Sequence, residues 1–422
     1  MPLIFSMVCT SWMNAGKMNL EKRMVTLKGS TWSSVRATVA PAFSTAKIRQ
    51  MIPTLNESSQ ICVKILKDYA KKGEKVPIRE TMVRVMLDMT SKAAFGRDFN
   101  VQHDEQSTFI DYAKKYAEFD FRSPRIVAIT LFPNLCWVFK KLTGYSILNN
   151  ETNRYFVEIL DHLYENRIDN KENYDYKDFF QLMLSAMKEE DKNREIDREI
   201  EFEITGKSEK SSKGIKKQHI FGQAFMFILA GFETGPINLH LTVYMLAMHE
   251  EWQERVRNEI ESVLNGKEPD YVSLAELPLL EQCIHETQRL FPAVVRLNRM
   301  CTKPVELNGI LMPKGSVFSI PVYNIHHSEK FYENPEEFRP ERWSPEEKAK
   351  RDPLTFLPFG HGPRNCIGMR VGQFQMRSVL VHLLRHFRLT IADGSPKTLP
   401  LEIDTRGSFR TVSPLYINVE TI

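Results

Sequence analysis

Apolar residues in the first half of the chain mostly recur at helical spacing. Between residues 56 and 198 they lie three and four positions apart, as at Val83, Met86 and Leu87, and this spacing predicts amphipathic helices. Residues 188–217 are instead mostly Lys, Glu, Asp, Arg and Ser with almost no aromatic residue, a composition typical of solvated chain. The pattern therefore predicts a helical first half that ends in an exposed linker.

After this linker the pattern changes from long helical periods to short β-type runs. Two such runs lie around the turn signals Asn308-Gly309 and Pro313-Lys314-Gly315, and this pattern predicts a hairpin. The whole indicates one large, mainly α domain with a smaller β-rich part. The predicted elements are a helix over 218–264 with breaks near Pro236 and His249, a helix over 279–290, a hairpin over 305–311 and 316–321, a helix over 371–386, and short strands at Leu389 and Tyr416.

Charge, cysteine usage and hydropathy limit the class of protein. With 57 Lys and Arg against 53 Asp and Glu, the net charge of +4 is too small to favour a nucleic-acid partner and suits an acidic partner or an anionic membrane surface. The six cysteines form no C-x-x-C pair, which favours buried free thiols in a reducing compartment. The apolar runs at 1–8 and 220–232 are shorter than the ~20 residues of a spanning helix. We expect no transmembrane segment and no disulfide framework.

The strongest chemical signal is a glycine-rich loop before the last predicted helix. It reads Phe359-Gly360-His361-Gly362-Pro363-Arg364-Asn365-Cys366-Ile367-Gly368. Glycines let the backbone approach the Cys366 sulfur, and a helix N-terminus offers unpaired N–H groups and partial positive charge that stabilise a thiolate. An inert buried cysteine in a turn is the alternative for a lone Cys, but the complete motif disfavours it.

This loop resembles the haem-binding loop of cytochromes P450, over roughly residues 20–422. The resemblance implies the cytochrome P450 fold, with haem b between a long distal helix and the helix after the cysteine loop, and Cys366 as the iron ligand. Such a thiolate donates electron density to the iron and favours O–O cleavage. It further implies contacts of Phe359 and Gly368 with the cofactor.

Basic residues elsewhere resemble the family's haem-propionate ligands. Trp32 and Arg36 match the W-x-x-x-R helix and lie one turn apart, so both would project toward the same carboxylate. Arg299 and Arg364 are the other two expected ligands. A core tryptophan and a surface arginine would be the ordinary reading of the first pair without the motif.

A second motif, Ala230-Gly231-Phe232-Glu233-Thr234, resembles the family's oxygen-activating segment. A carboxylate beside a hydroxyl can relay the protons that oxygen reduction consumes, so Glu233 and Thr234 are the predicted catalytic residues. Pro236 has no N–H and would open the helix at the carbonyl of Phe232; a plain proline kink is the alternative. Gly235 departs from the family, which usually has Thr or Ser there.

Glu286 and Arg289 resemble the family's Glu-x-x-Arg pair, which a later arginine, here Arg342, completes as a buried charge network. The spacing alone is weak evidence, because it also occurs at four other glutamates, where an exposed ion pair worth under ~1 kcal/mol is the expected structure. What distinguishes the first pair is the order of the segments that follow. The four other glutamates with an arginine three residues later are Glu151, Glu195, Glu254 and Glu336.

Taken together, the resemblance implies a monooxygenase that inserts one atom of O₂ into a small apolar substrate. Electrons would come from NADPH through NADPH-cytochrome P450 reductase, with cytochrome b5 as a further donor, to a monomer at the cytosolic face of the endoplasmic reticulum membrane. Docking would use basic residues on the thiolate face, although solvated charge is the ordinary reading of any one of them. These residues are Lys47, Arg49, Lys140, Lys141, Lys348, Lys350 and Arg370.

The start of the chain matches the family least well. Residues 1–16 resemble nothing recognised and are expected to precede a catalytic domain over 17–422 that lacks the family's anchor, first strands and first helices. Two alternatives follow. One is a haem-thiolate protein that rearranges peroxides, which Glu233 and Thr234 argue against; the other is a truncated, non-catalytic paralogue or fragment that does not retain haem.

Overall fold

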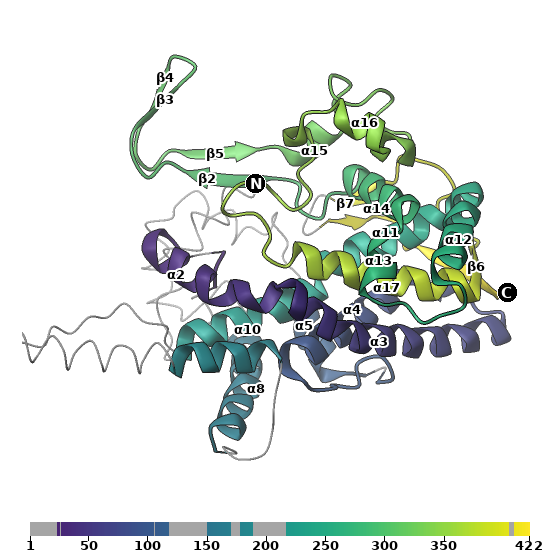
Figure 1. The fold of residues 1–422 in the computed structure, drawn as a ribbon, viewed down its shortest axis with the longest axis horizontal. Helices are drawn as coiled ribbons and strands as arrows, with labels where there is room; N and C mark the ends of the chain where they lie inside the picture. Colours follow the sequence, from purple (N-terminus) through teal and green to yellow (C-terminus); the bar gives the residue numbers. More distant parts are fainter. Residues whose placement is uncertain are drawn as a thin grey trace, which may run out of the picture.

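The computed structural model describes residues 23–25, 27–104, 106–117, 150–169, 178–188, 217–404 and 409–422. Most of the predicted linker, the segment 1–16 and the basic residues Lys140 and Lys141 lie outside these residues. Helices dominate, with a small β-rich part at one side (Figure 1). The predicted fold class, mainly α with a smaller β part, is therefore confirmed.

The helices of the first half form as their apolar spacing predicts. Two of them end where a glycine takes a left-handed backbone conformation: α3 at Gly73 (φ 65°) and α4 at Gly96 (φ 61°). Such a residue lets the chain turn away while its N–H binds a carbonyl of the last turn. The elements are α2 (Gly29–Val39), the 3₁₀ turn η1 (Ala40–Phe43), α3 (Thr45–Lys72), α4 (Ile78–Phe95), α5 (Thr108–Ala117) and α8 (Asn150–Asp169).

The long helix predicted over 218–264 is three helices. Its breaks lie at Glu233 and His249, as predicted near Pro236 and His249. Pro236 sits in the first turn of the middle helix, where its missing N–H costs nothing. The three helices are α10 (Lys217–Phe232), α11 (Thr234–Met248) and α12 (Glu250–Leu264). The helices that follow them are α13 (Tyr271–Ala275), α14 (Pro278–Leu290), α15 (Val322–His326), α16 (Pro345–Ala349) and α17 (Met369–His386).

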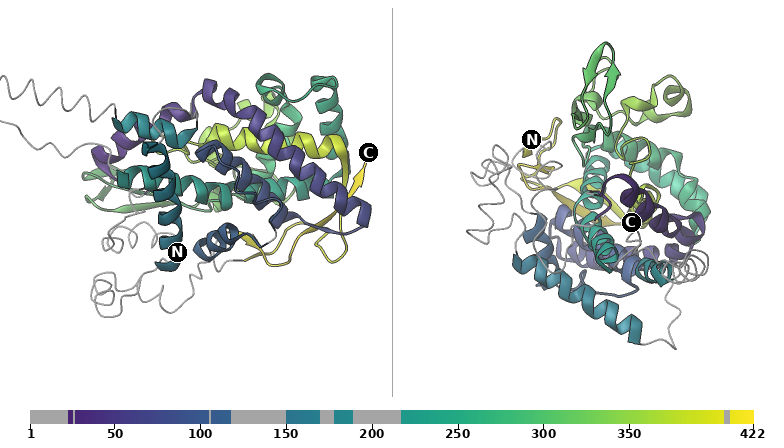
Figure 2. Two further views of the ribbon diagram at one scale, coloured as in Figure 1. Left: turned by 90° about the horizontal axis from the view of Figure 1, so that it is seen from below. Right: turned by 90° about the vertical axis from the view of Figure 1, so that its left-hand side faces the viewer.

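The predicted hairpin is confirmed at Asn308-Gly309, and the second predicted run pairs with another strand. Asn308 and Gly309 both have positive φ (50° and 77°), the geometry of a two-residue type I′ turn. This turn closes a hairpin within the first run, between β3 (Val305–Leu307) and β4 (Ile310–Met312). It stands away from the body in two views (Figures 1 and 2).

The second predicted run is β5 (Val317–Ile320), which pairs with a strand that the sequence pattern did not reveal, β2 (Leu297–Met300). The predicted strands at Leu389 and Tyr416 are confirmed as neighbours in an antiparallel sheet. The remaining elements are β1 (Val76–Pro77), β6 (Phe387–Ile391) and β9 (Tyr416–Thr421) in that sheet, the pair β7 (Ile403–Asp404) and β8 (Arg410–Thr411), and the 3₁₀ turns η2 (Pro340–Trp343) and η3 (Pro353–Thr355).

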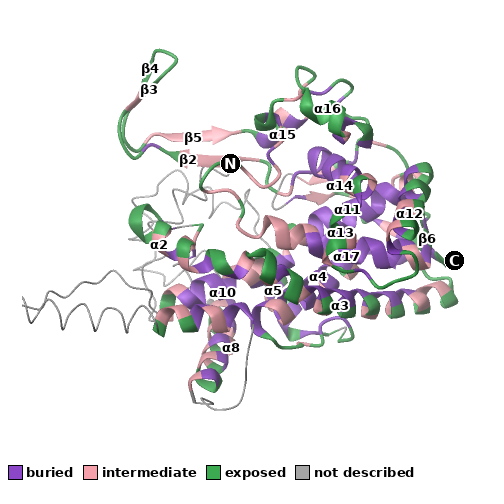
Figure 3. Ribbon diagram, viewed as in Figure 1, coloured by how far each residue is buried: buried purple, intermediate pink, exposed green. Residues whose placement is uncertain are grey.

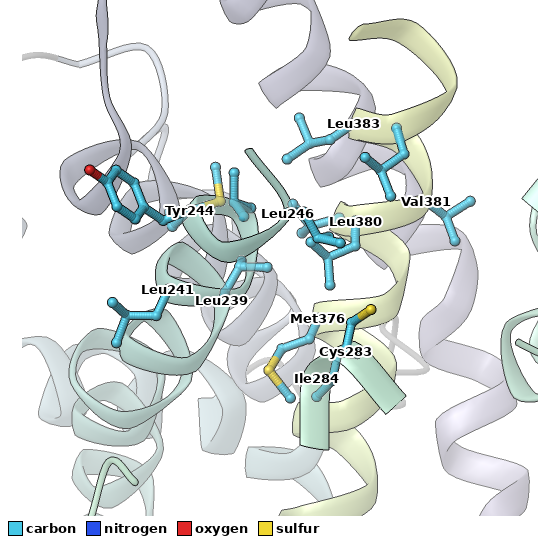
Figure 4. Close-up of a cluster of buried hydrophobic side chains, with 14 of the residues drawn as sticks. Leu239, Leu241, Tyr244, Leu246, Cys283, Ile284, Met376, Leu380, Val381 and Leu383 are labelled. Atoms are coloured by element: carbon cyan, nitrogen blue, oxygen red, sulfur yellow. The ribbon is translucent and has the colours of Figure 1, made fainter. Parts of the chain in front are cut away.

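The main core lies where α11, α14 and α17 meet (Figure 4). Burial follows these helices, whereas α16 and the β3–β4 hairpin are largely exposed (Figure 3). The segment Lys217–Met248 is long and apolar enough to span a membrane, but 61% of its most apolar window is buried inside the protein. This burial favours a core helix, which agrees with the sequence prediction for 220–232.

Candidate functional site

Cys366 lies in a loop that folds back on itself just before α17. Its N–H donates a hydrogen bond to the carbonyl of Phe359 (2.9 Å), and the N–H of Asn365 donates to the carbonyl of Gly362 (2.9 Å). Gly360 and Gly362 have φ values of 70° and 78°, which glycine adopts without the steric cost of a Cβ. The glycines therefore allow the turn that holds the cysteine in front of the helix.

The thiol of Cys366 differs from the other thiols that the structure describes. Its side chain is exposed, while those of Cys62, Cys283 and Cys301 are buried. Protein atoms still surround the sulfur on its other sides, and this partial burial raises the pKa of the thiol; the N–H of Gly368 and the charge of Arg36 act in the opposite direction. A metal-bound thiolate would keep both favourable interactions while the metal replaces the proton.

Arg36 connects α2 to the cysteine loop. Its Nη1 donates to the carbonyl of Asn365 (3.0 Å) and its Nη2 to the Asn365 side-chain oxygen (2.7 Å). The sequence reasoning missed this role of Asn365, although its position between Arg364 and Cys366 in the motif was a usable signal. The guanidinium is thereby held beside the residue that precedes the thiol.

Trp32, Arg36, Arg299 and Arg364 come together from three separate segments. The guanidinium carbon of Arg364 lies 4.2 Å from the Trp32 ring centre, and that of Arg36 lies 5.9 Å from it. Arg299, on β2, is oriented toward the same loop, with its Nη2 3.4 Å from the carbonyl of His361. Trp32 thus contributes its ring face to two guanidinium groups.

The three guanidinium groups have no acidic partner among the described residues. Burial lowers the pKa of Arg364, and the positive charges of Arg299 and Arg36 lower it further. Converging like charges are unfavourable unless an anion neutralises them. A ligand with two carboxylates, such as haem b with its propionates, fits this arrangement, and the exposed thiol beside it fits the iron.

Glu233 and Thr234 lie at the break between α10 and α11. Glu233 has φ −107° and ψ −66° and belongs to neither helix; its Oε1 is buried and has no hydrogen-bond partner among the described residues. The Thr234 hydroxyl lies 3.4 Å from the carbonyl of Ala230 and the side chain is exposed. A buried carboxylate oxygen without a partner is costly in free energy.

Glu286 forms the buried network that the sequence predicted. Its carboxylate accepts bonds from Nε and Nη2 of Arg289 (2.9 Å each) and from Nε of Arg342 (3.1 Å). Trp343, which the sequence reasoning did not include, donates its Nε1–H at 2.9 Å. Arg289 is fully buried and Arg342 nearly so. The network joins α14 to η2. Glu254 has the same three-residue spacing to Arg257, but its side chain is exposed and it pairs with that arginine at the surface.

Comparison with known proteins agrees with this geometry. The family model described as Cytochrome P450 matches residues 8–416. The chain is 31% identical to mouse Cytochrome P450 3A11 over 414 residues, which is 98% of this chain and 78% of that protein. It is 31% identical to human Cytochrome P450 3A5 over 416 residues, with the same two coverages, and 32% identical to rat Cytochrome P450 3A2 over 399 residues, 94% and 75%.

Proposed function

This chain belongs to the cytochrome P450 family, and on that premise we propose which of its residues carry the chemistry. The protein is a haem-thiolate monooxygenase, which inserts one atom of O₂ into a small apolar substrate with electrons from NADPH through a redox partner. The alternative of a non-catalytic fragment is not supported by its relatives. Domain limits of 1–16 and 17–422 stay a prediction.

The proposal rests on one observation: the exposed thiol of Cys366 lies beside guanidinium groups that have no acidic partner among the described residues. We assign Cys366 as the iron ligand, with the Gly368 N–H donating to its sulfur and Phe359 closing the loop through its carbonyl. Trp32, Arg36, Arg299 and Arg364 would hold the propionates. When bound, the haem supplies the iron centre at which O₂ is activated.

Proton delivery is assigned to Glu233 and Thr234. The unpartnered Oε1 of Glu233 can accept a proton in the relay and pass it on, and the exposed hydroxyl of Thr234 can orient it. Their place at a helix break supports this, because Glu233 Oε1 has no partner among the described residues and the Thr234 hydroxyl makes only a long bond of 3.4 Å to Ala230. A peroxide-rearranging enzyme would need no such pair.

The finer identity of the partners also belongs to the proposal. We infer NADPH-cytochrome P450 reductase and cytochrome b5 as electron donors, a monomeric protein, and the endoplasmic reticulum membrane as its place. Arg49 and Arg370 support a basic docking surface, since both contact Tyr271 beside α17. Lys350 supports it less, because Glu347 pairs with it at 2.6 Å.

The test is the spectrum of the reduced protein with carbon monoxide. The wild type should show the red-shifted Soret band of thiolate ligation, and Cys366→Ala should lose that band even where haem is retained. Cys301→Ala, which removes a buried thiol, is the matched control and should keep the band. A red-shifted band in Cys366→Ala would refute the ligand assignment.

A further inference from the structure

Helix α4 packs closely against the chain on both sides of the break at Glu233, against Gly231 and against Gly235. A Cβ built on Gly231 would lie 2.5 Å from Oγ1 and 2.7 Å from Cβ of Thr90. A Cβ on Gly235 would lie 2.5 Å from the terminal methyl of Met86. Gly231 and Gly235 are four residues apart, and so are Met86 and Thr90. Residues at this spacing lie on one face of a helix, so the Met86–Thr90 ridge of α4 fills the groove at the two glycines.

The two glycines bracket the helix break. Gly231 ends the last turn of α10 and Gly235 lies in the first turn of α11, with Glu233 and Thr234 between them. Neither residue is fixed by a strong hydrogen bond of its own side chain: Glu233 Oε1 has no partner among the described residues, and the Thr234 bond is long at 3.4 Å. Packing against α4 therefore restrains both sides of the break, in addition to the bond from the Glu233 N–H to the carbonyl of Leu229 (2.9 Å).

Thr90 also reaches the helix that follows the cysteine loop. Its hydroxyl donates to the carbonyl of Met86 (2.7 Å) and accepts a bond from Nε2 of Gln375 (3.3 Å) on α17. Thr90 and Gln375 are both buried, so an amide that lost this acceptor would be left without a partner. One side chain thus contacts α10 through its carbon and oxygen atoms and α17 through its hydroxyl.

We infer that Met86 and Thr90 are positioning residues for proton delivery, with Gln375 linking Thr90 to α17. The contacts fix the height of the Glu233–Thr234 segment relative to the helix that begins after Cys366. The inference rests on the proposed relay role of Glu233 and Thr234. A Thr or Ser side chain at Gly235 would need the space of the Met86 methyl, so Met86 would have to shift.

The first test compares shape with hydrogen bonding at Thr90 in the purified holoenzyme. Thr90→Val keeps the shape and removes the acceptor, and should lower product formed per NADPH by about two- to tenfold, the range that corresponds to one ordinary hydrogen bond. Thr90→Ser should restore the ratio. Ser91→Ala is the matched control, because its buried hydroxyl binds only carbonyls of its own helix.

A second, non-catalytic readout is amide hydrogen exchange of residues 229–238. Exchange should become faster in Thr90→Val and stay at the wild-type rate in Ser91→Ala, while both variants keep the thiolate spectrum with carbon monoxide. Wild-type exchange in Thr90→Val would overturn the positioning role.

A third test uses the complementary pair at the other side of the break. Gly235→Thr should lower product per NADPH and raise peroxide release, since the new side chain displaces Met86. Adding Met86→Ala should bring the ratio back to within about twofold of the wild type, because the removed side chain vacates that space. Failure of the double variant to recover would argue that Gly235 acts without Met86.

Thr234→Ala, measured alongside, separates this inference from the proposed function. If Thr234→Ala lowers product per NADPH while Thr90→Val and Gly235→Thr do not, only the positioning role is overturned. If Thr234→Ala leaves the ratio unchanged, the relay is wrong and the inference falls with it.

Discussion

Removing the charge of Glu286 is expected to be far more damaging than removing a surface glutamate. The carboxylate accepts five hydrogen bonds: Oε1 binds Nη2 of Arg289, the N–H of Arg339 and Nε of Arg342, and Oε2 binds Nε of Arg289 and Nε1 of Trp343. In Glu286→Gln one oxygen becomes an NH₂ group. Two or three of these donors then face another donor, and the guanidinium of Arg289 stays buried without a counter-charge.

The magnitude follows from this burial. Breaking a buried ion pair by removing one partner costs about 3–5 kcal/mol, against a total stability of roughly 5–15 kcal/mol for a folded protein. Glu254→Gln is the matched control, because Glu254 has the same three-residue spacing to Arg257 but a side chain that is 49% exposed. Its loss should cost less than about 1 kcal/mol.

The assay is urea unfolding followed by far-ultraviolet circular dichroism, with the wild type and both variants measured in parallel. The difference in midpoint multiplied by a common slope gives the change in unfolding free energy. Equal midpoints for Glu286→Gln and Glu254→Gln would refute the reasoning, since the two differ in burial and in the number of bonds but not in residue type or spacing.

Two further predictions concern the propionate site and pH. Arg299→Gln should speed haem loss to apomyoglobin by about ten- to a hundredfold, the factor that corresponds to one hydrogen bond to a charged group. The haem-free chain should be no less stable, because the substitution removes one of three like charges. Unchanged haem loss would count against the site. Burial lowers the pKa of His326 to about 3 and of His240 to about 4. The free energy that the two neutral histidines contribute to folding is therefore fully present above the ordinary histidine pKa of ~6.5, and it should fall as pH drops toward 4 by up to about 1.4 kcal/mol per pH unit for each histidine. A urea midpoint unchanged from pH 7.5 to 5.0 would contradict this.

The helical part of the fold could be predicted because its signals are local. The spacing of apolar residues indicated α14 and α17 nearly to the residue, and Pro236 and His249 marked the breaks around α11. Strand pairing could not be predicted in the same way. β2 carries the polar residues Asn298 and Arg299 in a strand of four residues, so it has no apolar alternation, and its partner β5 lies beyond an intervening hairpin.

The candidate site divides along a similar line. Cys366, Arg36 and Glu286 belong to motifs whose residue types have a chemical reason; Arg36 contacts the loop that carries Cys366, and Glu286 binds Arg289. Asn365, Trp343 and Thr90 act through contacts that exist only after distant segments have packed together. Thr90 illustrates the limit: in the sequence it is one hydroxyl among several in a helix, and its neighbours Gly231 and Gln375 are more than a hundred residues away.

Glu286 and Glu233 are both partly or fully buried glutamates, but they differ in how many hydrogen bonds their carboxylate oxygens accept. Every oxygen of Glu286 is used by a donor, and a carboxylate so fully bonded cannot move without losing those bonds. Glu233 has a buried oxygen with no partner among the described residues and lies between two helices, which makes its position costly in free energy. Such a group persists only if the surrounding structure over-determines its position. The close contact of α4 with Gly231 and Gly235 is the restraint that we propose, so on the proposed relay role the neighbouring residues of α4 should affect proton delivery as well.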